Sequence, residues 1–342
     1  MSHKNLSVKT KNLKHLKNIL KNKKIAQIYK KFEKSIDINE NFAVAVSGGP
    51  DSLALSFLAK IYSIKKKVDV KFFIVDHKLR AESTSEAKFV RKILKRHLIN
   101  AEILTWKGKK PLKNIQSLAR KKRYELLINK CVKYKINSIL LGHHQDDLLE
   151  NFIIRMLRGS GLKGLISLSK KTKSDNVNLL RPLLNIKKKD LLSLSKYVFN
   201  FYVKDPSNEN TKYQRIKVRK LIKGLEKEGL DKKKFLKTIK NLKGSNDVVD
   251  FYVQKNLKKN TFFSPVKGNL IMNNYFFEQP YEVTFRALSD SIKLVGKKYY
   301  SVRGKKLDKI ISDIKKNRLF RATLGGCIIE KVNQTVIISK EY

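Results

Sequence analysis

Two short runs of the sequence combine residue types at spacings that suit chemistry on a phosphate compound. The first is SGGPDS at residues 47–52, which lies between two apolar stretches. Glycines let a phosphate approach the backbone closely, and the N–H groups that begin a helix bind anions. Ser47 and Ser52 can add hydroxyl donors, and Pro50 suits the first turn of a helix. This run therefore predicts a phosphate-binding loop.

Asp51 is unusual in such a loop, because a carboxylate repels a bound anion. A Mg²⁺ ion shared by carboxylate and phosphate oxygens would explain its presence. The alternative is a plain strand-to-helix turn in which Asp51 only stabilises the first turn of the helix. The run has neither the GxxxxGKS or GxxxxGKT pattern of a Walker A loop nor the GxGxxG pattern of dinucleotide-binding proteins.

The second run is LGHHQDDLLE at residues 141–150, which leaves an apolar stretch and enters a predicted helix. Asp147 and Glu150 are three residues apart, so a helix places both carboxylates on one face, with Asp146 within a turn of Glu150. Such a pair suits a cationic substrate group or a metal, although acids in a first helical turn can also simply stabilise the helix dipole. The two histidines lack a third His or Cys nearby, so hydrogen-bonding or nucleotide-stacking roles are expected of them.

Alternating elements must position these two runs. Short apolar runs predict buried strands, and longer segments predict helices. This alternation indicates a doubly wound α/β domain with a parallel sheet, whose carboxyl edge would carry both runs. The expected strands are 42–46, 68–75, 101–106 and 138–141, and the expected helices are 53–62, 83–97, 115–133, 145–157 and 187–197.

The rest of the chain predicts three parts. Residues 1–38 form a basic extension with helical spacing or a solvated tail, residues 39–222 form the catalytic domain, and residues 223–342 form a smaller basic α+β domain. A turn is expected at 205–208, and basic helices are expected over 213–262. Near the end, 323–330 and 335–338 are strand candidates.

Composition restricts the function. The 342 residues carry 77 Lys and Arg against 29 Asp and Glu, a net charge of +48. Such a charge predicts a nucleic-acid partner, although biased lysine usage is an alternative source of part of it. Two cysteines, Cys131 and Cys327, are too few for a disulfide framework or a zinc site. No apolar run is long enough for a membrane span and no secretory signal is visible, so a cytoplasmic protein is expected.

A strand followed by SGGxDS and a helix resembles the ATP pyrophosphatase, or PP-loop, superfamily, whose members cleave ATP between the α and β phosphates. The run HHxDDxxExF, continued by RGSGLKGL at 158–165, resembles the bacterial tRNA(Ile)-lysidine synthetases. Lys78 replaces the glycine of that family's VDHGLR segment, and no asparagine follows Arg215 in its RNxxR-like segment. Further matches are VDHKLR at 75–80, ARKKRY at 119–124, RPLL at 181–184 and DPSN at 205–208.

The resemblance implies a fold of the adenine nucleotide α-hydrolase type and a two-step reaction. ATP adenylates the C2 oxygen of the wobble cytidine in an isoleucine tRNA with a CAU anticodon and releases pyrophosphate. The ε-amine of free L-lysine then attacks C2 and expels AMP. ATP, Mg²⁺, L-lysine and this tRNA are therefore expected, without a membrane or an obligate protein partner. Another adenylating PP-loop tRNA enzyme and a non-catalytic RNA-binding relative are the alternatives; the first includes the thiolases, which generally need paired cysteines.

Site residues follow by matching motifs. The expected ATP-binding residues are Ser47, Gly48, Gly49, Pro50, Asp51, Ser52, Asp76 and His77, with Asp51 also contacting Mg²⁺. The expected catalytic residues are Asp51, Asp147, Glu150, Arg120 and Arg123, of which Asp147 and Glu150 also hold lysine. The expected tRNA-binding residues are Arg181, Arg215 and Arg219, and the remaining motif residues are His143, His144 and Asp146. Arg120, Arg123, Asp76 and His77 could instead play no part in the chemistry.

Overall fold

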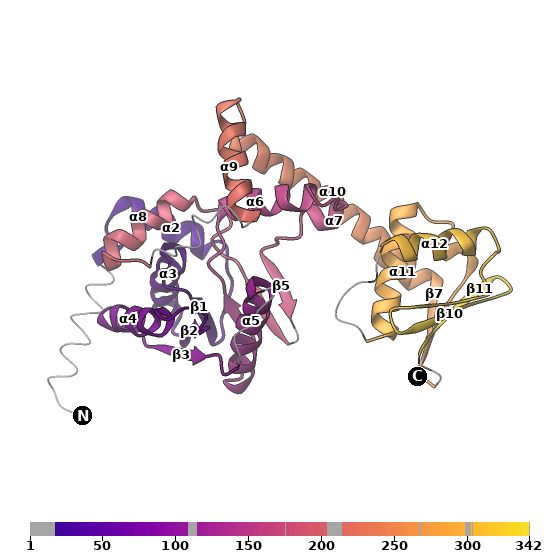
Figure 1. Cartoon of the computed structure of the whole chain (residues 1–342), viewed down its shortest axis with the longest axis horizontal. Helices are drawn as coiled ribbons and strands as arrows, with labels where there is room; N and C mark the ends of the chain where they lie inside the picture. The colour runs from indigo at the N-terminus through magenta and orange to yellow at the C-terminus, as the bar shows by residue number, and fades with distance from the viewer. Residues whose placement is uncertain are drawn as a thin grey trace. The chain divides into compact units, whose positions relative to one another are not determined.

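The computed structural model of the chain describes residues 18–108, 115–174, 176–203, 214–266, 268–297, 302 and 304–341. The chain divides into two compact units, Met1–Leu236 and Lys237–Tyr342 (Figure 1). The boundary predicted near residue 222 lies within a helix of the first unit, and the three-part division stays a prediction. The predicted turn at 205–208 and the first 17 residues of the predicted extension lie outside the described residues.

The first unit alternates strands and helices as the sequence predicts. In chain order its elements are α2 (Lys23–Glu33), β1 (Phe42–Val46), α3 (Pro50–Lys66), β2 (Val70–Asp76), α4 (Ser83–Arg96), β3 (Ala101–Thr105), α5 (Ile115–Lys133), β4 (Ser138–Leu140), α6 (Gln145–Met156), α7 (Leu162–Leu165), β5 (Lys171–Ser174), β6 (Val177–Leu180), α8 (Lys188–Phe199) and α9 (Gln214–Lys227). The predicted doubly wound α/β fold is confirmed.

The sheet of this unit has the strand order β3-β2-β1-β4-β6-β5. Its strands pair in parallel except at the end, where β5 runs antiparallel to β6 with Lys171 opposite Leu180. β5 has the sequence KTKS, whose polar residues give no apolar strand signal, and its pairing depends on β6. The antiparallel end strand is therefore a feature that the sequence reading missed.

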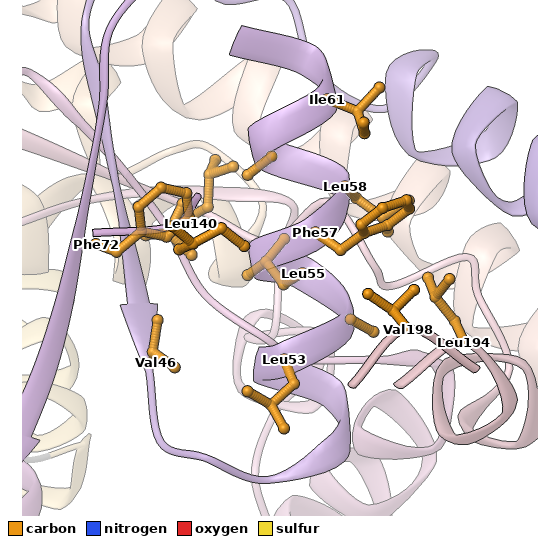
Figure 2. Close-up of a cluster of buried hydrophobic side chains, with 14 of the residues drawn as sticks. Val46, Leu53, Leu55, Phe57, Leu58, Ile61, Phe72, Leu140, Leu194 and Val198 are labelled. Carbon is orange, nitrogen blue, oxygen red and sulfur yellow. The ribbon is translucent and has the colours of Figure 1, made fainter. Parts of the chain in front are cut away.

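Helix α3 forms the centre of the core. It begins at Pro50, earlier than predicted, because the fixed φ of proline suits the first helical position. Its residues are buried around most of its circumference because it packs against both the sheet and α8. Figure 2 shows its side chains between Val46, Phe72 and Leu140 of the strands and Leu194 and Val198 of α8.

Helix α2 confirms the helical spacing predicted in the N-terminal region and belongs to this core. Ile25, Ile28 and Phe32 are buried, whereas its lysines lie on the other side. The side chain of Asn22 caps the helix by accepting hydrogen bonds from the N–H groups of Lys24 and Ile25 at 3.0 and 3.3 Å. From residue 18 onward this region is therefore an integral part of the fold.

The second unit is a five-stranded antiparallel sheet with helices on one face (Figure 1). Its sheet order is β7-β8-β11-β10-β9. Helix α10 continues into this unit from the first, and helices α11 and α12 were not expected from the sequence. Its elements are α10 (Lys232–Asn260), β7 (Thr261–Ser264), β8 (Asn269–Met272), α11 (Tyr281–Val295), α12 (Gly304–Lys315), β9 (Arg321–Leu324), β10 (Cys327–Val332) and β11 (Thr335–Lys340).

The single strand predicted over 323–330 is wrong. Gly325 and Gly326 adopt φ values of +66° and +76°, which turn the chain so that β9 and β10 pair antiparallel. Residues with a side chain rarely adopt this region of φ, so the two glycines favour a hairpin over a continuous strand. The segment 213–262, in which basic helices were predicted, forms two helices. The first ends at Lys227 and the second begins at Lys232.

Within the described ranges, no helix is both long enough and apolar enough to cross a membrane.

Replacing Phe32 by alanine should destabilise the first unit, because this ring is fully buried between α2 and α3 and contacts Tyr62 edge-on. The expected loss is about 3–5 kcal/mol of unfolding free energy. Urea unfolding followed by the fluorescence of Trp106, the chain's single tryptophan, measures it. Tyr197→Ala, at a side chain that is 60% exposed, is the control and should cost less than about 0.5 kcal/mol. Equal losses in the two variants would contradict the packing of α2.

Candidate active site

The two predicted runs meet at one edge of the sheet. Strand β1 leads into the SGGPDS loop and α3, and β4 leads through the two histidines into α6. β1 and β4 are parallel neighbours, so both segments leave the sheet at its carboxyl edge. The structure brings Nε2 of His144 to 3.6 Å from Oδ2 of Asp51. The predicted juxtaposition of the phosphate loop with the carboxylate run is confirmed.

The SGGPDS loop is held by its own polar groups and by a remote segment. The hydroxyl of Ser52 donates to the carbonyl of Gly49 at 2.9 Å and accepts from the N–H of Ser47 at 3.1 Å. The N–H of Val203 donates to the carbonyl of Gly48 at 2.9 Å. Gly48 has φ of +80°, and a Cβ there would lie 2.7 Å from Val90 and 2.9 Å from Val203. Gly48 is therefore required both by conformation and by space.

Asp51 lies in the first turn of α3 with 23% of its side chain exposed. Burial raises the pKa of its carboxyl group, although the nearby charges of His144 and Lys188 oppose this shift. Its Oδ1 atom is buried and has no hydrogen-bond partner among the described residues. A cation at this oxygen would satisfy it, so the site fits the predicted Mg²⁺.

The start of α6 joins the two halves of the site. Nδ1 of His144 accepts a hydrogen bond from the N–H of Asp146 at 3.2 Å, and Asp147 accepts from the N–H of His144 at 2.9 Å. In a neutral ring the hydrogen then lies on Nε2, which is 3.6 Å from Asp51 and 3.7 Å from Asp147. His144 therefore caps the helix and lies between two carboxylates.

Asp147 is buried, with 6% of the residue exposed. Burial alone would raise the pKa of its carboxyl group, but His144, His143, the N–H of His144 and Arg215 together hold that pKa below its usual value. His143 has a buried Nδ1 atom without a hydrogen-bond partner in the described part of the chain. Burial lowers the pKa of His143 to about 3.

Glu150 is 3% exposed, and two arginine side chains of α9 lie near its carboxylate. Two nitrogens of the Arg219 guanidinium donate to the two carboxylate oxygens of Glu150. Nε lies 2.6 Å from Oε1, and Nη2 lies 3.3 Å from Oε2. Arg215 lies farther away, with Nε 3.7 Å from Oε2 of Glu150 and Nη2 3.8 Å from Oδ1 of Asp147. The structure thus brings together four predicted site residues, although the sequence reading had assigned the arginines to tRNA and the acids to lysine.

Asp76 and His77 end β2 at the same edge of the sheet. Both oxygens of Asp76 are used, since Oδ1 accepts from the Lys78 N–H and the Ser83 hydroxyl and Oδ2 accepts from the Thr84 hydroxyl. These contacts join β2 to α4. Nε2 of His77 accepts from Nε of Arg123 at 3.1 Å, and burial together with this arginine lowers the pKa of His77 to about 4.

The other two predicted arginines differ in exposure. Arg120 is exposed on α5, where its guanidinium lies over the ring of Tyr124 at 5.1 Å. Arg181 is only 7% exposed, and its Nη1 donates to the carbonyl of Ser169 and the hydroxyl of Thr172 at 3.1 and 3.0 Å. These contacts hold β5 against β6. Its assignment to tRNA binding stays a prediction.

The sequence reading missed three contributors to the site. Lys188, at the start of α8, places a positive charge near Asp51, but one lysine among 77 basic residues gives no signal. Thr84 completes the hydrogen bonds of Asp76, and Val203 supports Gly48 from a distant segment. For Val203 the sequence contained no local sign, because its contact forms only in the folded chain.

Known proteins resemble this chain along most of its length. A family model for the PP-loop domain matches residues 18–225. The tRNA(Ile)-lysidine synthase of Orientia tsutsugamushi strain Boryong is 37% identical over 317 residues, which cover 89% of this chain and 70% of that protein. The tRNA(Ile)-lysidine synthase of Wolbachia pipientis wMel is 32% identical, over 89% of this chain and 71% of that protein. The tRNA(Ile)-lysidine synthase of Rickettsia akari strain Hartford is 31% identical, over 92% of this chain and 74% of that protein.

One solved structure shares the fold. The U34-tRNA thiolase NcsA from Methanococcus maripaludis superimposes with a TM-score of 0.56 and 22% sequence identity. The match covers 64% of this chain and 79% of that chain. At this identity the likeness supports the architecture of the fold alone.

Replacing Gly48 by alanine should destabilise the phosphate loop, because the new Cβ meets Val90 and Val203 at under 3.0 Å and the φ is positive. The expected loss is about 1–3 kcal/mol of unfolding free energy. Gly49→Ala is the matched control, since its φ is −71° and the nearest atom lies at 3.7 Å. Urea unfolding of both variants measures the difference, and equal stabilities would contradict the proposed role of Gly48.

The pKa of His77, about 4 in the folded chain against 6.5 in the unfolded chain, predicts an acid sensitivity. Below pH 6.5 the unfolded state binds a proton that the folded state does not, so this residue lowers stability as the pH falls toward 4. His77→Gln, which keeps an acceptor for Arg123, should shrink the drop in melting temperature between about pH 7 and pH 5. The same drop in the variant and the parent would show that His77 does not contribute.

Proposed function

Since the chain belongs to the tRNA(Ile)-lysidine synthase family of PP-loop proteins, we propose that it joins L-lysine to C2 of the wobble cytidine in a CAU-anticodon isoleucine tRNA. The product is lysidine, and ATP is converted to AMP and pyrophosphate. The resemblance first drawn from the two motifs is thereby confirmed. The observation that carries the proposal is the meeting of the phosphate loop with the buried carboxylates of α6, through His144 and Asp51 at 3.6 Å.

In the first step, the C2 oxygen of cytidine attacks the α phosphorus of ATP and pyrophosphate leaves. Residues 47–52 hold the phosphates, because the first N–H groups of α3 have no partner within the helix and point toward the loop. Mg²⁺ at the unpartnered oxygen of Asp51 would neutralise phosphate charge when bound. Asp76 and His77 frame the nucleotide from the next strand of the sheet.

In the second step, the ε-amine of lysine attacks C2, the C2–O bond breaks, and AMP leaves with that oxygen. An amine with an ordinary pKa of about 10.4 arrives protonated and must lose its proton before it attacks. Asp147 and Glu150 hold the lysine, and one of the two accepts the proton that its ammonium group loses. The low pKa of Asp147 keeps it ionised, which suits an acid that binds an ammonium group.

The arginines have separate roles in this proposal. Arg120, exposed on α5, reaches phosphate or the charge that develops on cytosine, and Arg123 positions His77. Arg181 holds β5 against β6, and Arg215 and Arg219 act beside the lysine-binding acids. The lysines of residues 223–342 hold the tRNA phosphates, in keeping with the net charge of +48. We place the reaction in the cytoplasm, as the sequence predicts.

Pyrophosphate release from ATP and incorporation of labelled lysine test the proposal directly. Both are expected with CAU-anticodon isoleucine tRNA and neither with elongator methionine tRNA. Asp51→Asn should lower the rate of pyrophosphate release by roughly 10²- to 10³-fold, because it removes the carboxylate that would hold Mg²⁺ beside the phosphates. Glu40→Gln, in the segment before β1 at the opposite end of that strand, is the control and should change neither rate.

Binding of the isoleucine tRNA without pyrophosphate release would favour a non-catalytic relative. Pyrophosphate release without lysine incorporation would instead indicate another adenylating enzyme. In either case lysidine synthesis would be excluded for this chain.

A further inference from the structure

The carboxylates assigned to lysine already carry arginine partners in the structure. We propose that Arg215 is an exchangeable occupant of this site, which leaves for a tRNA phosphate and thereby admits the lysine ammonium group. This inference rests on the proposed function, because it assigns an order of binding to the same site. It makes Arg215 a positioning residue that couples the tRNA to the amino acid.

The two arginines of α9 are held very differently. Arg219 makes the close two-sided contact with Glu150 and has 29% of its side chain exposed. Arg215 has 43% of its side chain exposed, and its nitrogens stay at 3.7 and 3.8 Å from the two carboxylates. These separations exceed hydrogen-bond distance, so Arg215 is held by charge alone. Arg219 is the fixed partner of Glu150, and Arg215 is the cation that can leave.

The position of Arg215 is the one that a substrate ammonium needs. It lies between the side chains of Asp147 and Glu150, of which 9% and 4% are exposed. Buried carboxylates require a nearby cation, so the site needs a substitute when lysine is absent. His144 and Arg219 also face these acids, and Lys188 lies near the adjacent Asp51. A further cation added beside Arg215 would be repelled by these basic groups, so lysine binds well only when Arg215 has moved.

A tRNA phosphate is the partner that favours this movement. Guanidinium groups bind phosphate with two parallel hydrogen bonds, and the exposure of Arg215 leaves it accessible to a polyanion. The triphosphate of ATP is a second anion source, and the experiment separates the two. The consequence of the exchange is that lysine binds tightly only after the tRNA has bound.

Equilibrium dialysis of labelled lysine against the full chain tests the exchange. Four conditions are compared: the protein alone, with α,β-methylene ATP, with isoleucine tRNA at saturation, and with both. Because the analogue cannot release pyrophosphate, no lysine is consumed. The tRNA should tighten lysine binding by roughly 5- to 150-fold, the usual range of coupling between two ligands, and the analogue alone should not.

Three variants identify the residue responsible. Arg215→Gln should tighten lysine binding to the protein alone several-fold and abolish most of the further gain caused by tRNA. Arg219→Gln should weaken lysine binding in every condition, because the Glu150 carboxylate loses the two contacts that hold it in position. Lys220→Gln removes a charge from an exposed position of the same helix and should leave all four lysine affinities unchanged. Melting curves confirm that each variant is folded.

Several results would overturn the exchange. Lysine affinity that is independent of tRNA would do so, as would weaker lysine binding in Arg215→Gln, which would make Arg215 a ligand of the lysine carboxylate. A gain produced by the ATP analogue alone would assign the phosphate to the nucleotide. In each case the lysine-incorporation assay still decides the proposed function separately, because an enzyme without this coupling forms lysidine all the same.

Discussion

The cost of burying negative charge organises this site. Asp51, Asp147 and Glu150 come from two helices that leave neighbouring strands, and the residues at 147 and 150 are almost fully buried. Three carboxylates this close together repel one another unless cations or helix N-termini compensate them. The start of α6, His144 and the arginines of α9 provide that compensation. The unpartnered oxygen of Asp51 marks the place where compensation is still incomplete.

The cost of burying charge also keeps the two proposed binding sites apart. The loop before α3 presents N–H groups to an anion, whereas the first turns of α6 present acids to a cation. His144 lies between them, with Nε2 3.6 Å from Oδ2 of Asp51 and 3.7 Å from Oδ2 of Asp147. The proposed phosphate site and the proposed ammonium site therefore lie side by side. The basic remainder of the chain serves a different purpose, since it attracts a polyanion rather than arranging the reacting atoms.

Sequence patterns predicted the elements whose signals are local. The apolar run at 42–46 predicted β1 because a parallel strand is buried on both faces, and α5 was predicted with its observed limits, 115–133. The polar strand β5 and the glycine turn within 323–330 were missed, because pairing with a neighbouring strand determines them. In the site, the motifs identified Asp51, Asp147 and Glu150, which the structure brings together. The contact of Arg219 with Glu150 joins residues 69 positions apart, and no spacing rule predicts it.

The contact between Gly48 and Val203 has a consequence for protein engineering. A strand, the six-residue phosphate loop and a helix form a continuous stretch of chain that could be grafted onto another α/β scaffold. Here the Val203 N–H fixes the Gly48 carbonyl, and its side chain fills the space beside Gly48. The conformation of the loop thus depends on a second segment of the chain, the one that contains Val203. A graft of residues 42–66 alone would carry the glycines without the support that shapes them, so a working transplant must include the segment after α8 that contains Val203 as well.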